Sequence, residues 1–116
     1  MSDPPEYSPL SPAAFQILVA LAASPRHGYA IMKDVAAVTS GDVRLNPGTL
    51  YTTIRKLLEE GLIREAATPV SGADHDERRR YYAITPAGGR AARAELARLR
   101  ALIDRASVKL AGKTAG

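Results

Sequence analysis

The chain has 116 residues, no cysteine and a net charge of +4, from 16 lysines and arginines against 12 acids. This length is typical of one domain that buries its own core, and the missing cysteines exclude thiol nucleophiles, thiolate metal sites and disulfide scaffolds. No apolar run approaches the ~20 residues that span a bilayer and no secretory leader opens the chain, so we expect a cytoplasmic protein without membrane contact, whose basic charge suits a polyanion.

Three pairs of an N-cap residue and a proline predict where helices begin. Proline is favoured at the first helical position because its missing N–H has no partner there. The pairs are Ser11-Pro12, Asn46-Pro47 and Thr85-Pro86. Apolar residues recur at helical spacing after each pair, and again from about 26 to 38. The third helix is expected to end at Gly61, a natural C-capping residue, and the last at about 110.

Two short strands complete the pattern. Residues 62–66 leave the third helix directly, and residues 79–84 are rich in aromatic and β-branched side chains. Three helices and a β-hairpin predict a mainly α fold, a winged helix-turn-helix domain over residues 11–85. A long C-terminal helix is expected at 86–111, with a flexible N-terminal segment at 1–10 and a tail at 112–116.

Four motifs stand in the order and approximate spacing of a known family. They are His27-Gly28-Tyr29-Ala30-Ile31, Asn46-Pro47-Gly48-Thr49-Leu50-Tyr51, Leu57-Leu58-Glu59-Glu60-Gly61-Leu62-Ile63 and Arg79-Arg80-Tyr81-Tyr82-Ala83-Ile84-Thr85-Pro86-Ala87-Gly88. From about 10 to 110 the chain resembles the PadR family of transcriptional regulators, above all its small subgroup with a single long C-terminal helix. The resemblance implies a cytoplasmic, dimeric, DNA-binding repressor, often released by a small aromatic or drug-like effector.

The third helix carries the candidate DNA-reading surface. If Leu50, Ile54 and Leu57 face the core, the opposite face presents hydroxyls, a phenol and two cations. Hydroxyls and the N–H groups of a helix N-terminus bind phosphate, and basic side chains reach phosphate or base edges. The predicted contacts are Pro47, Gly48, Thr49, Tyr51, Thr52, Thr53, Arg55 and Lys56. The alternative is an ordinary solvated helix face.

The densest basic run, residues 78–80, falls on the predicted wing. We predict DNA contacts from Arg79 and Arg80, at the backbone or in the minor groove. The alternative is a charged edge strand that discourages association between sheets. The acidic loop at 74–77 places carboxylates around His75, but without a second group of ligands it reads as a solvated loop tip. We therefore predict neither a metal nor a cofactor.

The final helix carries apolar residues at the spacing of a heptad seam. The seam consists of Ala92, Leu96, Leu99, Ile103, Ala106 and Leu110. A helix this long projects past a small core, so the seam needs a partner, either the first helix of the same chain or a second copy. We predict a homodimer with an interface of Phe15, Leu18, Leu96, Leu99, Ile103, Ala106 and Leu110.

No catalytic arrangement supports an enzyme, and His27 is interpreted as capping or packing the start of its helix. Tyr29, Tyr81 and Tyr82 are interpreted as packing residues rather than as a pocket lining. The leading hypothesis is a homodimeric repressor that binds a double-stranded DNA operator and is released by a small aromatic effector. The rivals are a winged-helix dimer that binds a protein partner without reading DNA, and a protein that sequesters a ligand.

Overall fold

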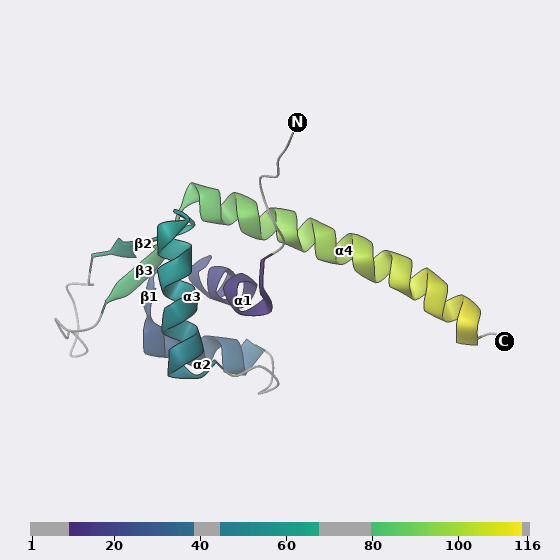
Figure 1. Cartoon of the computed structure of the whole chain (residues 1–116), viewed down its shortest axis with the longest axis horizontal. Helices are drawn as coiled ribbons and strands as arrows, with labels where there is room; N and C mark the ends of the chain where they lie inside the picture. The colour runs from purple at the N-terminus through teal and green to yellow at the C-terminus, as the bar shows by residue number, and fades with distance from the viewer. Residues whose placement is uncertain (1–9, 39–44, 68–79, 115–116) are drawn as a thin grey trace.

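The computed structural model describes residues 10–38, 45–67 and 80–114. In chain order the elements are α1 (Pro12–Leu21), β1 (Arg26–His27), α2 (Gly28–Val38), α3 (Pro47–Glu59), β2 (Ile63–Ala66), β3 (Tyr81–Ile84) and α4 (Pro86–Thr114). Helices α1 to α3 and the sheet form one body, from which α4 extends to one side (Figure 1). The predicted fold class, a winged helix-turn-helix followed by a long C-terminal helix, is confirmed.

The predicted caps form as expected at the start of α1, α3 and α4. The side-chain oxygens of Ser11, Asn46 and Thr85 accept hydrogen bonds from the backbone N–H three residues further on, at 3.1, 2.8 and 3.0 Å. Each bond satisfies an N–H group that has no partner within the helix. The three helices therefore begin where the sequence predicts.

At its other end, α3 closes with a Schellman motif. Gly61 has a φ of 76° and donates its N–H to the Leu58 carbonyl at 3.1 Å. The N–H of Leu62 donates to the Leu57 carbonyl at 3.0 Å. A positive φ suits glycine, which has no Cβ, and the turn sends the chain straight into β2. The prediction that Gly61 caps α3 is confirmed.

The sheet has three antiparallel strands in the order β1-β3-β2, one strand more than the predicted hairpin. Arg26 pairs with Tyr82 and His27 with Tyr81 on one side of β3, and Ile63 pairs with Ile84 on the other. Residues 26–27 were expected to begin a helix, so this part of the prediction is wrong. The helix starts instead at Gly28, because the Nδ1 of His27 accepts the N–H of Ala30 at 3.2 Å and caps it.

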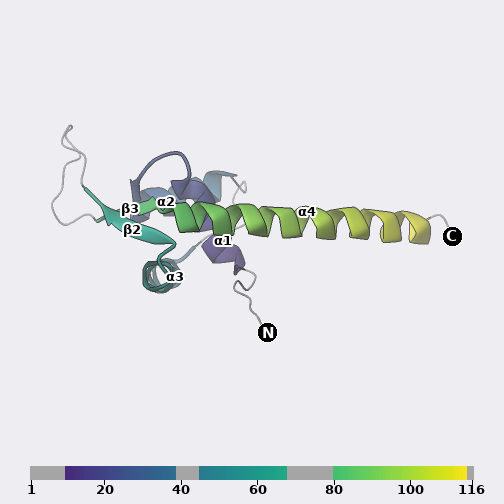
Figure 2. The same ribbon diagram turned by 90° about the horizontal axis from the view of Figure 1, so that it is seen from above.

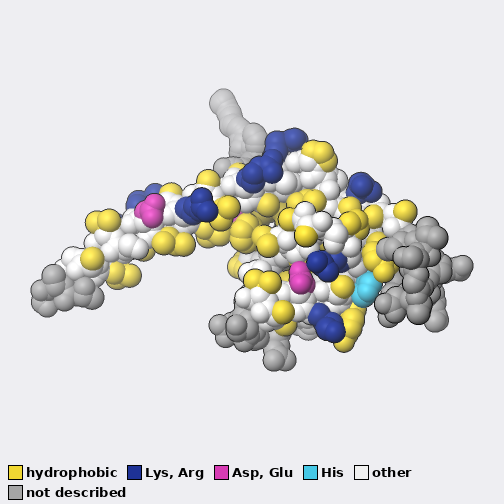
Figure 3. Space-filling view, turned by 180° about the vertical axis from the view of Figure 1, so that it is seen from behind, with side chains coloured by type: hydrophobic (Ala, Val, Ile, Leu, Met, Phe, Trp, Pro, Cys, Tyr) yellow, Lys and Arg dark blue, Asp and Glu magenta, His cyan; other side chains and the backbone are white. Residues whose placement is uncertain are grey.

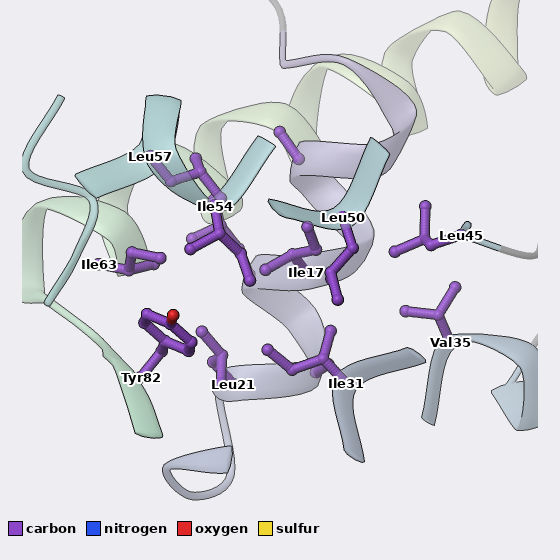
Figure 4. Close-up of a cluster of buried hydrophobic side chains, with 13 residues drawn as sticks. Ile17, Leu21, Ile31, Val35, Leu45, Leu50, Ile54, Leu57, Ile63 and Tyr82 are labelled. Atoms are coloured by element: carbon purple, nitrogen blue, oxygen red, sulfur yellow. The ribbon is translucent and has the colours of Figure 1, made fainter. Parts of the chain in front are cut away.

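The core of the body lies where α1, α2, α3 and the sheet meet (Figure 4). Leu50 and Ile54 of α3 lie beside Ile17 of α1, and Ile63 and Tyr82 close the side formed by the sheet. The most deeply buried side chains are Ile17, Leu18, Leu21, Ile31, Val35, Leu50, Ile54 and Leu57. This packing fixes which face of α3 points outward.

One predicted interface residue belongs to this core instead. Leu18 has no exposed surface, so it has nothing to offer a second copy of the chain. Leu18 and Phe15 are three residues apart on the wide apolar stripe of α1, so helical spacing assigned both to one interface. In the structure Leu18 is buried, whereas Phe15 lies at the edge of the core. Phe15 is half-buried and keeps part of its side chain at the surface. Leu18 is therefore removed from the predicted interface.

Helix α4 docks tightly at its N-terminus. The hydroxyl of Thr85 donates to the Gly61 carbonyl at 2.7 Å. The backbone at Gly88 passes so close to the Leu62 carbonyl oxygen that a Cβ at position 88 would collide with it. The helix then continues to Thr114, past its expected end, and its second half extends clear of the body (Figures 1 and 2). No helix within 10–38, 45–67 and 80–114 is long and apolar enough to cross a membrane.

Glu95 of α4 is buried, although most charged residues lie at protein surfaces. Its carboxylate accepts the backbone N–H of Leu10 at 3.3 Å and the Nε–H of Arg98 at 3.1 Å. The side-chain hydrogen bond from Arg98 lowers the pKa of Glu95 below its usual range, outweighing burial, which would raise it. The carboxylate therefore stays ionised inside the fold and ties α4 to the segment before α1.

We expect acid to remove the stabilisation that Glu95 provides. A carboxyl whose pKa is lowered by folding stabilises the fold above its unfolded pKa of about 4.3, and the effect is lost as the pH falls through the folded value. Wild type should therefore melt at a higher temperature than Glu95→Gln at neutral pH, and the difference should begin to shrink below about pH 4.3 and disappear only below the lowered pKa of the folded state. Thermal unfolding of both proteins across this range is the measurement. Parallel pH curves would contradict the prediction.

Candidate nucleic-acid interface

The outward face of α3 follows from the burial of its apolar stripe. Leu50, Ile54 and Leu57 are 0%, 2% and 1% exposed, and at 3.6 residues per turn the intervening side chains point away from the body. The predicted contacts with exposed side chains or backbone are Pro47, Gly48, Thr49, Tyr51, Thr52, Arg55 and Lys56, while Thr53 is half-buried. The structure thus brings the predicted α3 residues together on one helix face.

Tyr51 is held in place by a contact that the sequence analysis did not predict. A Cβ at Gly28 would lie 2.5 Å from the Tyr51 hydroxyl oxygen, so only glycine allows the phenol to pack over the start of α2. The Tyr51 side chain nevertheless remains 47% exposed. A side chain at position 28 would therefore displace the Tyr51 phenol from its place beside the start of α2.

The other aromatic residues divide between core and surface. His27 lies edge-on to Tyr81, with ring centroids 5.3 Å apart, so its interpretation as a capping and packing residue is confirmed. Tyr82 is buried, and burial is the main reason why the pKa of its phenol is raised. The nearby Glu65 carboxylate raises this pKa further, so the phenol stays protonated. Tyr29 was expected to pack in the core, but it is 58% exposed and carries the ammonium of Lys33 5.5 Å from its ring centroid. That expectation is wrong because Tyr29 lies on the solvent side of α2.

The strands of the wing, β2 and β3, lie beside α3 (Figures 1 and 2), and Arg80 at the start of β3 forms an ion pair. The guanidinium of Arg80 donates to the Glu65 carboxylate at 2.9 Å, and the two side chains are 70% and 53% exposed. Arg79 and the acidic loop at 74–77 lie outside the described residues. Exposed pairs of this kind are weak, so Arg80 can exchange its partner for a phosphate, but Glu65 keeps a negative charge beside it.

We expect Glu65→Gln to increase non-specific DNA binding. The substitution removes the charge that holds Arg80 and repels phosphate. It should raise affinity by a factor of about 1.4 to 5 at low salt, which corresponds to the ~0.2–1 kcal/mol of an exposed pair. The gain should shrink as salt is added, because the added charge contact is screened. Fluorescence anisotropy with a random-sequence duplex at two salt concentrations measures it. A gain that persists in the Glu65→Gln, Arg80→Ala double variant would show that Arg80 is not responsible.

The described residues hold no metal centre. No group of three or more His, Asp or Glu side chains comes together within ranges 10–38, 45–67 and 80–114. The outward face of α3 presents hydroxyls, a phenol, two cations and the N-terminus of the helix, and the two-stranded wing lies next to it. These are groups that bind phosphate and base edges. Together with the fold, they define a winged-helix protein with a surface suited to nucleic acid.

A family model makes the assignment specific. The model of the PadR-like family of transcriptional regulators matches residues 17–94, which include the second half of α1, α2, α3, the sheet and the start of α4. The chain belongs to this family, whose members are regulators rather than enzymes. A comparison with curated protein sequences gave no match.

Solved structures with the same architecture include several regulators. A transcriptional regulator from Clostridium thermocellum matches with a TM-score of 0.70 and 25% identity, over 84% of this chain and 87% of that one. A PadR family transcription regulator from Clostridium difficile matches with a TM-score of 0.73 and 20% identity, over 86% and 99%. Bacillus subtilis PadR in complex with operator DNA matches with a TM-score of 0.62 and 22% identity, over 76% of this chain and 48% of that one.

Proposed function

We propose that this protein is a homodimeric repressor that binds a double-stranded DNA operator in the cytoplasm, with α3 in the major groove and the wing on the adjacent backbone. One observation carries the proposal. The buried stripe of α3 turns Thr52, Arg55 and Lys56 outward together, on a helix whose N-terminus is also exposed. In a helix-turn-helix made of α2 and α3, α3 is the second helix, which is the one that reads base edges in the major groove.

The seam of α4 supports the dimer. Of its members, Leu96, Ile103 and Leu110 are 42%, 61% and 62% exposed, while Leu99 and Ala106 are half-buried. Hydrophobic side chains follow the length of α4, with basic side chains above them (Figure 3). An apolar stripe of this length on the surface favours association with another protein surface. A second α4 offers the same stripe, and together with Phe15 it would complete the interface around a two-fold axis.

A small aromatic effector is the remaining part of the proposal. Its support is the family resemblance, together with the apolar side chains that α4 exposes. A flat apolar molecule could lie against such side chains without needing charged partners. Binding there would change how the two copies meet, and this would release DNA by altering the spacing of the two α3 helices.

DNA from upstream of the protein's own gene provides the first test. A repressor of this kind should protect a short, roughly palindromic segment from nuclease, and its affinity for that segment should fall steeply with added salt. No salt-dependent binding to any duplex would favour the alternative of a dimer that binds a protein partner. Ligand binding that DNA does not alter would favour the sequestering protein instead.

A further inference from the structure

Glu95 has a role that neither DNA contact nor the dimer seam accounts for. Among the described residues it is the one charged side chain that is buried, at 6% exposure. It receives the Leu10 N–H on one carboxylate oxygen, and Arg98 donates to both oxygens. Leu10 and Glu95 are 85 residues apart in the chain, so the contact joins two separate segments.

The position of Glu95 along α4 is as informative as its partners. It is the last buried residue of the helix, since every side chain from 96 to 112 is exposed or half-buried. The helix is fixed at its N-terminus, where Gly88 meets Leu62, and again at Glu95, about 10 Å further along its axis. From Glu95 the helix continues for about 28 Å to Thr114. A short anchored portion therefore determines the direction of a long projecting arm.

The side chains of α4 that pack next to Glu95 are small. Ala91, Ala92 and Ala94 present single methyl groups on the neighbouring turns of α4. Small apolar contacts tolerate rotation and sliding, whereas hydrogen bonds weaken steeply when their angles change. The bond from the Leu10 N–H is the one that joins the Glu95 carboxylate to a different segment, and a tilt of α4 would leave this N–H without its acceptor. Arg98 lies on the same helix and keeps the carboxylate oriented, so the bond to Leu10 restrains α4 against the body in a way that its methyl groups do not.

We propose that Glu95 is a positioning residue that fixes the direction in which α4 leaves the winged-helix body. If the protein is the proposed dimer, the same residue sets the separation of its two recognition helices. A tilt of about 10° at Glu95 would move the far end of the helix by ~5 Å, which exceeds the ~3.4 Å rise of one base pair. The first statement concerns a single chain, and only the second depends on the proposed function.

A distance between two spin labels in one chain tests the first statement. The chain has no cysteine, so Ser24→Cys and Val108→Cys can be labelled without interference. Ser24 is exposed just after α1, and Val108 is exposed on the side of α4 opposite the seam. Labelled chains are diluted with unlabelled wild type, so that pulsed dipolar spectroscopy measures the distance within one chain.

Glu95→Leu is the decisive variant because it separates position from stability. Leucine fills the buried site with an apolar side chain of similar size, so the protein should remain folded although the Leu10 N–H loses its acceptor. The label distance should nevertheless shift or broaden by several ångström, since the directional bond between the Leu10 N–H and α4 is lost. The matched control is Asp104→Asn, which removes an exposed carboxylate from the same helix and should leave the distance unchanged. A wild-type distance distribution in Glu95→Leu would overturn the proposal.

Glu95→Gln adds a test of the hydrogen bonds themselves. Glutamine keeps an oxygen acceptor for the Leu10 N–H at nearly the same volume, so the mean label distance should stay that of wild type. A mean displaced as far as in the leucine variant would show that hydrogen bonding does not position the helix. A single label at Ser24→Cys then reports the distance between two chains. If wild type gives no signal between chains, the proposed dimer is rejected. The positioning role of Glu95 is tested separately, by the distance within one chain.

Discussion

Replacing Arg55 and Lys56 by alanine should abolish tight operator binding while leaving the melting temperature nearly unchanged. Each contact to a base edge or phosphate contributes about 1–3 kcal/mol, so losing both should weaken binding at least ~30-fold. The remaining affinity should depend less on salt, because fewer counterions are released. Both side chains are exposed and alanine is the best helix former, so the fold has no reason to respond.

The control for this variant must remove the same charge from elsewhere. Arg90→Ala with Arg105→Ala does so on α4, at exposed positions on the side of the helix away from the seam. If the protein attracts DNA only through its net charge, both double variants will lose affinity equally. If α3 reads the groove, only the α3 variant will lose its preference for operator over random duplex. Operator binding at wild-type strength by the α3 variant would show that another surface meets the DNA.

The parts of the fold that the sequence predicts are those determined by neighbouring residues. A cap such as Asn46 needs only the backbone N–H three residues on, and Gly61 needs only the turn it occupies. The buried stripe of α3 follows in the same way from a spacing of three and four residues. For this reason the outward face of α3 could be predicted before the structure was known.

The strand β1 could not be predicted, because its partners are distant in the chain. Arg26 and His27 become a strand by pairing with Tyr82 and Tyr81, more than fifty residues away. Two residues carry no period of their own, and the helical pattern that follows them extends across the boundary. Only the cap formed by His27 marks where the helix starts, and histidine is not among the strongly preferred N-cap residues.

Apolar spacing also does not say what covers a helix face. Leu18 and Leu96 both lie on apolar stripes, yet the first is buried in its own chain and the second is 42% exposed. Glu95 shows the converse, because it stands three residues after Ala92 and four before Leu99, on the stripe that faces the body. An acid at such a position was a signal for a buried carboxylate, but its partner Leu10 belongs to a segment 85 residues away.

Ile103→Lys should convert the protein to a folded monomer that no longer binds its operator tightly. Ile103 is 61% exposed in the single chain, so the substitution leaves the core untouched. In a two-fold dimer, each copy would place an unpaired ammonium in the apolar seam. An unpaired charge buried at an interface is costly by several kcal/mol, so we expect the dimer dissociation constant to rise at least ~100-fold.

Val108→Lys is the matched control for this variant. It adds the same charge to the same helix, but at a side chain that is 74% exposed and lies opposite the seam. Sedimentation of wild type and both variants at one concentration should show two dimers and one monomer. The two dimers should bind the operator tightly and the monomer should not. A single winged helix makes too few base contacts for tight binding, whereas two copies bind two half-sites about 34 Å apart. A monomeric wild type, or an Ile103→Lys protein that remains dimeric and binds normally, would exclude α4 as the dimer seam.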